Sequence, residues 1–497
     1  MITPLFNEFE KMYEGISCTV PVAKEYLADV ETPVSVLARL NNLENIALFE
    51  SVEGGERWGR YSILCLNPES VLTINDNCAV HKDIDGTLIE ENKKEPFELL
   101  RKILKENATA ENSALAPFSG GALGYLSYEA ARYFDRQPQP KGQAGVADAM
   151  FMIGGNLIIF DNVKHTIKVV CIVKKSAEIY AETAYNKALN EIDNIANLVF
   201  NAPSNISKSM TVKNRGLNIN TNITKEQFIS NVEKAKEEIR NGEIIQVVLS
   251  QKFCCPQTSD EISLYRALRY TNPSPYTFFL KMADITLIGS SPEVMTRLKN
   301  NIATVRPIAG TRPRGANEQM DRDLANELLN DSKERAEHVM LVDLGRNDLG
   351  RVAESSSVKV KDFMTIERYS HVMHIVSNIE AQLDPNKHDS IDLIKATFPA
   401  GTLSGAPKIR AIEIINDLES ERRGVYGGCV GYFGFDGNMD TAITIRTMQI
   451  HNGEISFQAG AGIVYDSDAE TEYEETIHKS NAIRNAIEFA NNNLSLA

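Results

Sequence analysis

Residues 425–466 read VYGGCVGYFGFDGNMDTAITIRTMQIHNGEISFQAGAGIVYD. Within this stretch, Tyr432–Thr447 predicts two strands around a short turn, because apolar and β-branched residues flank the turn-forming triplet Asp-Gly-Asn. Strands that return through a short turn pair in the antiparallel sense. The stretch therefore predicts an antiparallel β-sheet near the C-terminus.

The first half of the chain repeats this pattern. Residues 70–92 read as strand, turn, strand, and residues 154–175 as a hairpin that closes near Asp161–Asn162. Helical periodicity appears at 95–107 and 177–200.

The second half begins with a helix that has recognisable end signals. Thr224 can cap the helix over 224–242, with Gln227 at the capping-box position and Gly242 at the end. A strand over 243–253 follows. With further helices over 332–352 and from about Asp468, the sequence predicts an α+β fold with large antiparallel β-sheets flanked by helices.

The length bounds the number of domains. A single hydrophobic core stops growing near 250–300 residues, so a chain of 497 residues predicts two domains or lobes. Residues 201–222 are polar and lack periodicity, and we expect the linker there. This gives an N-terminal domain over 1–200 and a second domain over 223–497.

Composition excludes several classes of protein. The net charge of −15 argues against a general nucleic-acid partner, which would need a basic stripe. The longest mostly apolar run, 149–160, is too short to span a membrane, and the N-terminus lacks the basic and apolar regions of a signal peptide. Seven cysteines without a CxxC pair indicate reduced thiols. We expect a soluble, cytoplasmic protein.

Two helices far apart in the sequence each carry a pair of glutamates. Glu334 and Glu337 lie three residues apart, as do Glu472 and Glu475, so each pair shares one helix face. Lys479 follows one turn after Glu475. Such pairs are usually solvated surface, but four carboxylates would also suit Mg²⁺, which takes one or two directly and keeps several waters.

Ten segments together resemble the chorismate-utilising enzymes, and over nearly the full chain the anthranilate synthase component I branch of that family. The resemblance runs from about residue 45 to 480 and includes NPSPYTFFL, GSSPEVMTRL, RPIAGTRPRG, EHVMLVDLGRNDLGRV, FPAGTLSGAPKIRA and QAGAGIVYDSDAETEYEET. It implies a Mg²⁺-dependent lyase that converts chorismate and ammonia to anthranilate and pyruvate.

The resemblance also implies roles for individual residues. Glu337 and Glu475 would bind Mg²⁺ directly, and Glu334 and Glu472 would hold metal-bound water. Glu293 would be the general acid for the departing 4-hydroxyl group. His374 would assist the loss of pyruvate, His371 being the less favoured of the two histidines there.

The substrate contacts are assigned partly by chemistry and partly by resemblance. The fork of Arg446, in the predicted strand segment ITIRTM, suits the enolpyruvyl carboxylate, and small residues of the AGAG segment let backbone N–H groups approach an anion. The full expected set is Gly310, Thr311, Tyr426, Arg446, Gly460, Ala461, Gly462 and Lys479.

Two positions separate the branches of the family. Relatives that add water to chorismate carry an activating lysine where this chain has Gln246, and the para-aminobenzoate branch carries a lysine where this chain has Ala309. Both differences favour direct attack by ammonia. The rivals are aminodeoxychorismate synthase component I and a catalytically silent tryptophan-binding regulator.

Ammonia is expected from a separate glutamine amidotransferase subunit, in a heterotetramer. Cys429 in GGCVG superficially fits a glutaminase elbow, but that elbow needs a helix after it, and strands are predicted here.

A tryptophan feedback site is also implied by the resemblance. Ser51 would hydrogen-bond the inhibitor, and Pro275, Tyr276 and Thr277 would line its pocket. Many family members have Met at the position of Thr277.

Overall fold

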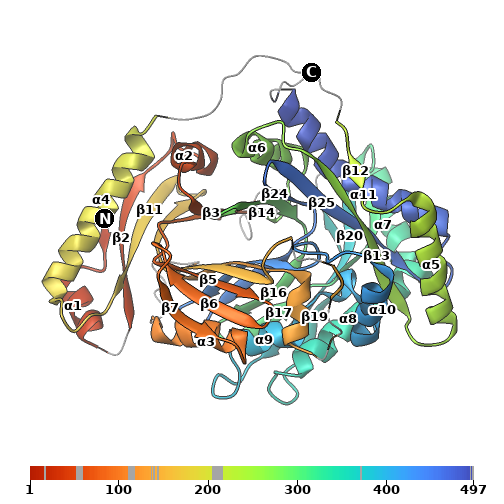
Figure 1. Ribbon diagram of the computed structural model, residues 1–497, viewed down its shortest axis with the longest axis horizontal. Coiled ribbons are helices and arrows are strands. Elements are labelled where there is room, and N and C mark those ends of the chain that lie inside the picture. Colours follow the sequence, from red (N-terminus) through yellow and green to blue (C-terminus); the bar gives the residue numbers. More distant parts are fainter. Residues whose placement is uncertain are drawn as a thin grey trace.

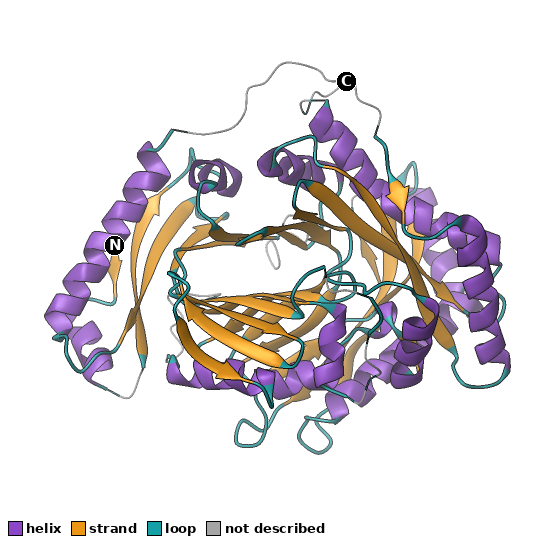
Figure 2. Ribbon diagram, viewed as in Figure 1, coloured by secondary structure: helices purple, strands orange, loops and turns teal. Residues whose placement is uncertain are grey.

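The computed structural model describes residues 1–15, 18–51, 60–109, 118–135, 137, 140–142, 145–203, 217–369, 372–492 and 494. Within these residues the strands form two large antiparallel sheets, with helices on their outer sides (Figures 1 and 2). This confirms the predicted α+β fold with antiparallel sheets.

Sheet A has 13 strands among the described residues. In spatial order they are β1 (Ile2–Thr3), β2 (Thr19–Leu27), β11 (Thr166–Lys174), β10 (Asn156–Asp161), β4 (Tyr61–Leu66), β3 (Asn45–Glu50), β14 (Tyr276–Met282), β15 (Ile285–Ser291), β24 (Thr447–His451), β25 (Glu454–Ile463), β13 (Gln246–Pro256) and β12 (Asn220–Thr221), with β21 (Gly405–Ala406) also paired to β13.

Sheet B has 12 strands within the same ranges. Their order is β18 (Ile308–Pro313), β20 (Val372–Gln382), β17 (Ile302–Val305), β16 (Val294–Lys299), β23 (Met439–Ile443), β22 (Cys429–Gly434), β8 (Gly121–Leu126), β9 (Ala149–Ile153), β5 (Ser70–Asn75), β6 (Cys78–Asp83) and β7 (Leu88–Asn92), with β19 (Lys359–Arg368) also paired to β20.

The helices are distributed along the whole chain. They are α1 (Phe6–Glu14), α2 (Pro33–Leu40), α3 (Pro96–Glu106), α4 (Ala181–Asn201), α5 (Lys225–Arg240), α6 (Glu261–Thr271), α7 (Glu318–Asn330), α8 (Ser332–Gly350), α9 (Ser390–Thr397), α10 (Lys408–Leu418) and α11 (Ala469–Asn491), with 3-10 turns η3 (Tyr128–Tyr133) and η4 (Gly401–Leu403).

Alternation along the strands divides the core into two large clusters. Ala47 and Leu280 of sheet A join Leu72 and Phe433 of sheet B in the cluster between the sheets. Leu48, one residue along β3, points to the other face, which packs on α1, α2, α4, α6 and α11. Sheet A is therefore covered on both faces.

Most element predictions are confirmed. Both N-terminal hairpins form, and Thr224 and Gln227 make the reciprocal capping box at the start of α5. Helix α4 begins at Ala181, four residues later than predicted, because the carbonyls of Ser176 and Ile179 accept hydrogen bonds from the Tyr13 hydroxyl in a turn before the helix.

Both sheets take strands from either side of residues 201–222. In sheet A, β3 pairs with β14, and in sheet B, β22 pairs with β8. The predicted boundary thus falls between segments that share sheets, and much of the predicted linker, 204–216, lies outside the described residues. The domain division stays a prediction.

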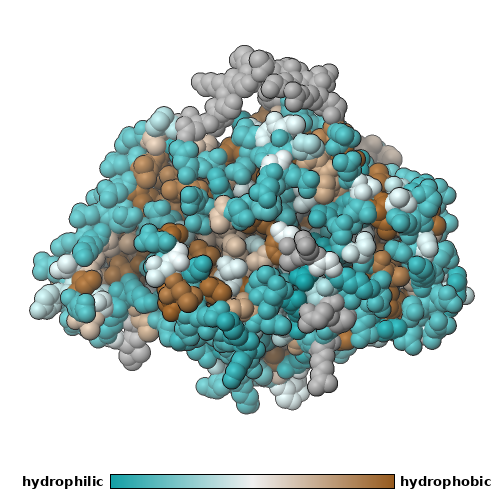
Figure 3. All heavy atoms as spheres, in the orientation of Figure 1, coloured by the Kyte–Doolittle hydropathy of each residue, from teal (hydrophilic) through white to brown (hydrophobic). Residues whose placement is uncertain are grey.

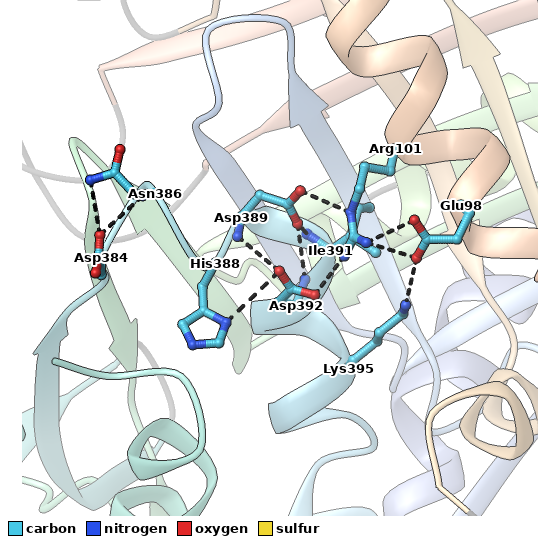
Figure 4. A network of polar contacts seen from close by, with 9 residues as sticks. All are labelled: Glu98, Arg101, Asp384, Asn386, His388, Asp389, Ile391, Asp392 and Lys395. Atoms are coloured by element: carbon cyan, nitrogen blue, oxygen red, sulfur yellow. Dashed lines mark hydrogen bonds and ion pairs between the residues drawn. The ribbon is translucent and has the colours of Figure 1, made fainter.

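A polar network also ties the two halves together (Figure 4). Arg101 of α3 contacts Asp389 at 2.9 Å and also binds Asp392 of α9, while Lys395 reaches Glu98 at 3.1 Å. These side chains are only partly exposed, so solvent screens them less than it screens a fully exposed pair.

The visible face of the molecule in Figure 3 is mainly hydrophilic, with hydrophobic residues in small separate groups. Among the described residues, no helix combines the length and apolar character needed to cross a membrane.

We predict that Arg101→Ala lowers the free energy of unfolding by about 1–3 kcal/mol, because three carboxylates would lose their shared cation. Chemical denaturation measures this. Arg322→Ala, which breaks an exposed pair with Glu318, is the control and should change stability by less than about 0.5 kcal/mol. Equal losses in both variants would show that the network does not join the halves.

Candidate active site

A cavity of about 580 Å³ lies beside the paired strands of the second half. Its lining includes nearly every residue predicted for catalysis, substrate contact and metal binding. These are Gln246, Glu293, Gly310, Thr311, Glu334, Glu337, His374, Tyr426, Arg446, Gly460, Gly462, Glu472, Glu475 and Lys479.

The cavity lies where the chain crosses from one sheet to the other. The chain passes from β15 into β16 and from β23 into β24. Strands β15 and β24 are neighbours in sheet A, and β16 and β23 are neighbours in sheet B. The backbone N–H of Ile443 donates to the carbonyl of Glu293 at 3.0 Å, and that of Ser290 donates to the carbonyl of Arg446 at 3.2 Å. The two crossings therefore fix each other, with Glu293 on one and Arg446 on the other.

Glu293 is a buried carboxylic acid. Only 8% of the residue is exposed, and burial raises its pKa to about 8, although the Thr402 hydroxyl donates to its Oε1 at 3.0 Å. The positive charges of Lys479 and Arg446 act in the opposite direction to burial. Near neutral pH this side chain holds a proton that it can deliver into the cavity.

Arg446 does not lie in a strand, contrary to the prediction. Strand β23 ends at Ile443 and β24 begins at Thr447, so Arg446 sits in the crossing between the sheets. Its φ of +49° is rare for a residue with a side chain and is typical of strained functional positions. Its guanidinium donates to Asn272 at 3.4 Å.

His374 is held in one tautomer. Its Nδ1 lies 3.0 Å from the carbonyl oxygen of Gly310, and a carbonyl can only accept, so Nδ1 carries the hydrogen. The Thr311 hydroxyl lies at the same distance from Nδ1. Burial lowers the pKa of His374. The ring is therefore neutral near neutral pH, with Nε2 free of a proton and able to take one.

The four predicted glutamates come from α8 and α11 and line one cavity. Burial raises the pKa of Glu334, and the charge of Glu337 on the same helix raises it further. Burial also raises the pKa of Glu472, and the charge of Glu475 adds to this effect. Glu337 accepts from Gln246 Nε2 at 3.2 Å, and Glu475 pairs with Lys479 at 2.7 Å.

This donor set fits a hard divalent cation. All four groups offer carboxylate oxygens, and burial, with the like charge of a helix neighbour, raises the pKa of Glu334 and of Glu472, so a nearby cation would favour their charged forms. In the part of the chain that the structure describes, no three acidic, His or Cys groups are close enough to share an ion. Mg²⁺, which takes one or two carboxylates directly and keeps several waters, would not need such a cluster.

Small residues bring the backbone of β25 close to other groups of the cavity. A Cβ on Gly460 would lie 2.7 Å from the Tyr426 hydroxyl, and one on Gly462 would lie 2.7 Å from Gln246 Nε2. Lys479 donates to the carbonyl of Gly460 at 3.1 Å. The alternate residue, Ala461, is fully buried in an apolar cluster and is absent from the lining.

The residues predicted for tryptophan lie together at a different place. Thr277 at the start of β14 pairs with Glu50 at the end of β3, so Ser51 follows directly beside Tyr276. The Tyr276 hydroxyl donates to Asp440 at 2.9 Å. The Thr277 hydroxyl is buried and donates to the carbonyl of Ser274 at 3.3 Å.

Some cavity residues were missed by sequence reasoning. Thr402 and Leu403 belong to a recognised segment, FPAGTLSGAP, but an irregular turn has no periodicity that would mark them as functional. Gln458 of β25 was missed for a similar reason, since it reads as an ordinary polar strand residue.

Cys429 does not take part in this site. It is fully buried in β22, burial raises its pKa to about 12, and strand β23 follows instead of a helix. The prediction that it is not a glutaminase nucleophile agrees with this environment. His371 lies outside the described residues.

Comparisons with known proteins agree with the motifs. A family model described as chorismate binding enzyme matches residues 88–485. The chain is 42% identical over 502 residues to a protein named anthranilate synthase component 1 from Acinetobacter calcoaceticus, covering 99% of each chain.

Two solved structures resemble the fold. Anthranilate synthase component I from Streptococcus pneumoniae TIGR4 has a TM-score of 0.76 at 36% identity, covering 92% of this chain and 98% of that one. The menaquinone-specific isochorismate synthase from Escherichia coli has a TM-score of 0.69 at 18% identity, covering 97% and 98%. The second likeness shows the fold alone.

The raised pKa of Glu293 predicts a pH-dependent stability difference. Its folded pKa of about 8 exceeds the ordinary value of 4.5, so the folded state binds the extra proton between these values. The free energy of unfolding therefore falls as pH rises through this window, and Glu293→Gln removes that loss. Between pH 4.5 and pH 8, we expect the free energy of unfolding of the variant to rise by roughly 2–5 kcal/mol relative to that of wild type.

Denaturation at several pH values, without divalent cations, measures this difference. Exposed Glu8→Gln is the control and should show no such trend. A constant difference between Glu293→Gln and wild type from pH 4.5 to 8 would mean that Glu293 binds its proton equally in the folded and unfolded states, and that burial does not raise its pKa.

Proposed function

Because the chain belongs to the chorismate binding enzymes, we propose that it is the large subunit of an anthranilate synthase, which converts chorismate and ammonia to anthranilate, pyruvate and water. The observation that carries the proposal is the buried acid Glu293, with its pKa raised to about 8, facing a cavity that holds Arg446 and His374. The cavity thus contains a proton donor, an anion ligand and a proton acceptor.

The charges of the cavity orient a substrate with two carboxylates. Arg446 suits the carboxylate of the enolpyruvyl arm, because a guanidinium can bind both of its oxygens, and Lys479, which pairs with Glu475, adds a further positive charge. The ring carboxylate would face the glutamates of α8 and α11. When bound between Glu337 and Glu475, Mg²⁺ would neutralise these groups and bind the ring carboxylate.

The chain's own residues supply the proton transfers. Glu293 gives its proton to the 4-hydroxyl group, which leaves as water while ammonia forms a bond to ring carbon 2. Nε2 of His374 is suited to take the proton from carbon 2 as the enolpyruvyl C–O bond breaks. The ammonium group formed at carbon 2 loses a proton, which restores Glu293 to its acid form. The enolpyruvyl group gains the proton taken up by His374 and leaves as pyruvate, and the ring becomes aromatic.

Two cavity positions favour ammonia over other nucleophiles. Gln246 donates to Glu337 and has no basic nitrogen that could activate water. Ala309 lines the cavity without a nucleophilic group. These positions argue against the addition of water. They also argue against covalent attack by a lysine, which is the reaction expected in the para-aminobenzoate branch.

Ammonia would come from a separate glutaminase subunit. Cys429 is buried, does not line the cavity and has a pKa raised by burial, so this chain's own GGCVG segment is unsuited to glutamine hydrolysis. We propose a glutamine amidotransferase partner, assembled with this chain as a heterotetramer. Free ammonium salts should replace the partner in an assay.

Feedback inhibition by tryptophan is the regulatory part of the proposal. Ser51, Tyr276 and Thr277 lie together at the ends of β3 and β14, and β14 continues through β15 into the crossing that carries Glu293. A ligand at this place could therefore bias the arrangement of the active site. A silent tryptophan-binding regulator is disfavoured, since it would not need the proton donor and acceptor of the cavity.

The purified chain should form anthranilate from chorismate, Mg²⁺ and ammonium at alkaline pH, followed by fluorescence. Chelation of the metal should abolish product formation. Glu337→Gln and Glu475→Gln should each lower activity by at least about 100-fold. Loss of a residue that only supports a metal ligand lowers activity by up to about 100-fold, and loss of a direct ligand should lower it at least as much.

Glu470→Gln is the matched control on α11, since Glu470 pairs with Lys225 and does not line the cavity. Full activity of Glu337→Gln would remove the metal assignment. Isochorismate or aminodeoxychorismate as the product would overturn the choice of branch.

Ser51→Ala should weaken tryptophan inhibition without changing uninhibited turnover. Loss of one hydrogen bond of about 1 kcal/mol corresponds to roughly a 5-fold higher half-inhibitory concentration. Thr183→Ala, on the exposed side of α4, is the control. An unchanged inhibition curve for Ser51→Ala would place tryptophan elsewhere.

A further inference from the structure

Arg423 is a buried arginine behind the wall of the active-site cavity. Its side chain is 2% exposed, and four of its five N–H donors are used. Nε and one terminal nitrogen form a fork on Glu419, at 2.8 and 2.7 Å. Its guanidinium stacks over the ring of Tyr128 at 4.6 Å and lies 5.8 Å from that of Tyr426.

The two remaining bonds end on the cavity wall. Arg423 donates to the carbonyls of Leu403 and Val248, each at 2.7 Å, and both residues line the cavity. Leu403 follows Thr402, whose hydroxyl donates to Glu293. Val248 lies two residues after Gln246 on β13, on the same face of the strand.

The segment that carries Arg423 also holds the crossing between β23 and β24. The backbone N–H of Gly427 donates to the carbonyl of Thr444 at 3.0 Å, and the N–H of Thr444 donates to the carbonyl of Gly428 at 3.0 Å. Thr444 lies two residues before Arg446. Tyr426, between Arg423 and these bonds, contributes its ring to the cavity.

Glu419 extends the contacts in another direction. It accepts from the backbone N–H and the hydroxyl of Ser250, each at 2.9 Å, and the Ser250 hydroxyl accepts from Gln458, a cavity residue, at 2.7 Å. The ion pair of Arg423 and Glu419 thus joins parts of β13, β25, η4 and the segment after α10. Helix α10 itself packs beside β13 (Figure 1).

We propose that Arg423 is a positioning residue for the reaction, which holds the Leu403 carbonyl so that Thr402 keeps Glu293 aimed at the leaving hydroxyl group. The inference rests on the proposed function, because it concerns the acid step of that reaction. Arg423 does not touch the substrate, since it acts through the backbone at Leu403 and Val248.

Lysine could not replace arginine here. An ammonium group has three donors at one point, whereas the planar guanidinium reaches Glu419, Leu403 and Val248 in fixed directions and stacks on Tyr128. Arg423→Lys therefore keeps the charge and loses the geometry.

The test is steady-state kinetics of the full chain with chorismate, Mg²⁺ and ammonium. For Arg423→Lys we expect kcat to fall by about 30-fold, while KM for chorismate stays within about 3-fold. Thr402→Val should itself lower kcat by about 10-fold. In the Thr402→Val background, Arg423→Lys should lower kcat by only about 3-fold. The difference from the roughly 30-fold loss in wild type corresponds to a coupling free energy of about 1.4 kcal/mol.

The control is Arg39→Lys. Arg39 is also mostly buried and bonds Glu31 and the carbonyl of Val199, far in sequence from the cavity residues. It should leave kcat unchanged. If Arg423→Lys does not fold, as judged by circular dichroism, Glu419→Gln replaces it and should show the same coupling to Thr402→Val.

Each outcome decides the proposal. A kcat within 2-fold of wild type for Arg423→Lys, or losses that simply multiply in the double variant, would overturn the positioning role. An equal rise in KM would point to general damage of the cavity and would also overturn it. If wild type forms no anthranilate, the proposed function itself fails, and this inference fails with it.

Discussion

The active site depends on a single backbone constraint, the pair of crossings between the two sheets. Where β15 passes into β16 and β23 into β24, the strand ladders are interrupted, and the N–H groups of Ile443 and Ser290 bond across to Glu293 and Arg446. These two bonds hold an acid and a cation at the same opening. Both residues lie in the segments between strands, and both line the cavity.

The electrostatic balance of the site follows from this arrangement. An acidic chain binds a substrate with two negative charges only if cations gather locally, and Arg446 and Lys479 both line this cavity, Lys479 beside Glu475. The four glutamates that line the same cavity would repel a carboxylate without a metal. Glu293 stays protonated near neutral pH because the effect of burial on its pKa outweighs that of the nearby positive charges.

Much of this could be predicted from the sequence, because the signals are local. The hairpins, the capping box at Thr224 and the spacing of the glutamate pairs all depend on neighbours within a few residues. The roles of Glu293 and His374 needed the family resemblance, since a single acid or histidine has no pattern of its own. The structure adds the burial of Glu293 and the tautomer of His374.

The remaining features depend on pairing over long distances. The alternation of ITIRTM continues through Arg446, so it reads as one strand, and the positive φ at Arg446 has no glycine to mark it. The pairing of β3 with β14, which lie on either side of residues 201–222, leaves no trace in local periodicity. Thr402, Arg423 and Glu419 become meaningful only when the fold brings them behind Glu293.

The most direct test of the account is a crystal structure of this chain with Mn²⁺, anthranilate and pyruvate, using the anomalous signal of manganese to locate the metal. The account predicts the ion between Glu337 and Glu475, on the carboxylate of anthranilate, with the pyruvate carboxylate on Arg446. An ion bound elsewhere, or anthranilate with its carboxylate on Arg446, would contradict it.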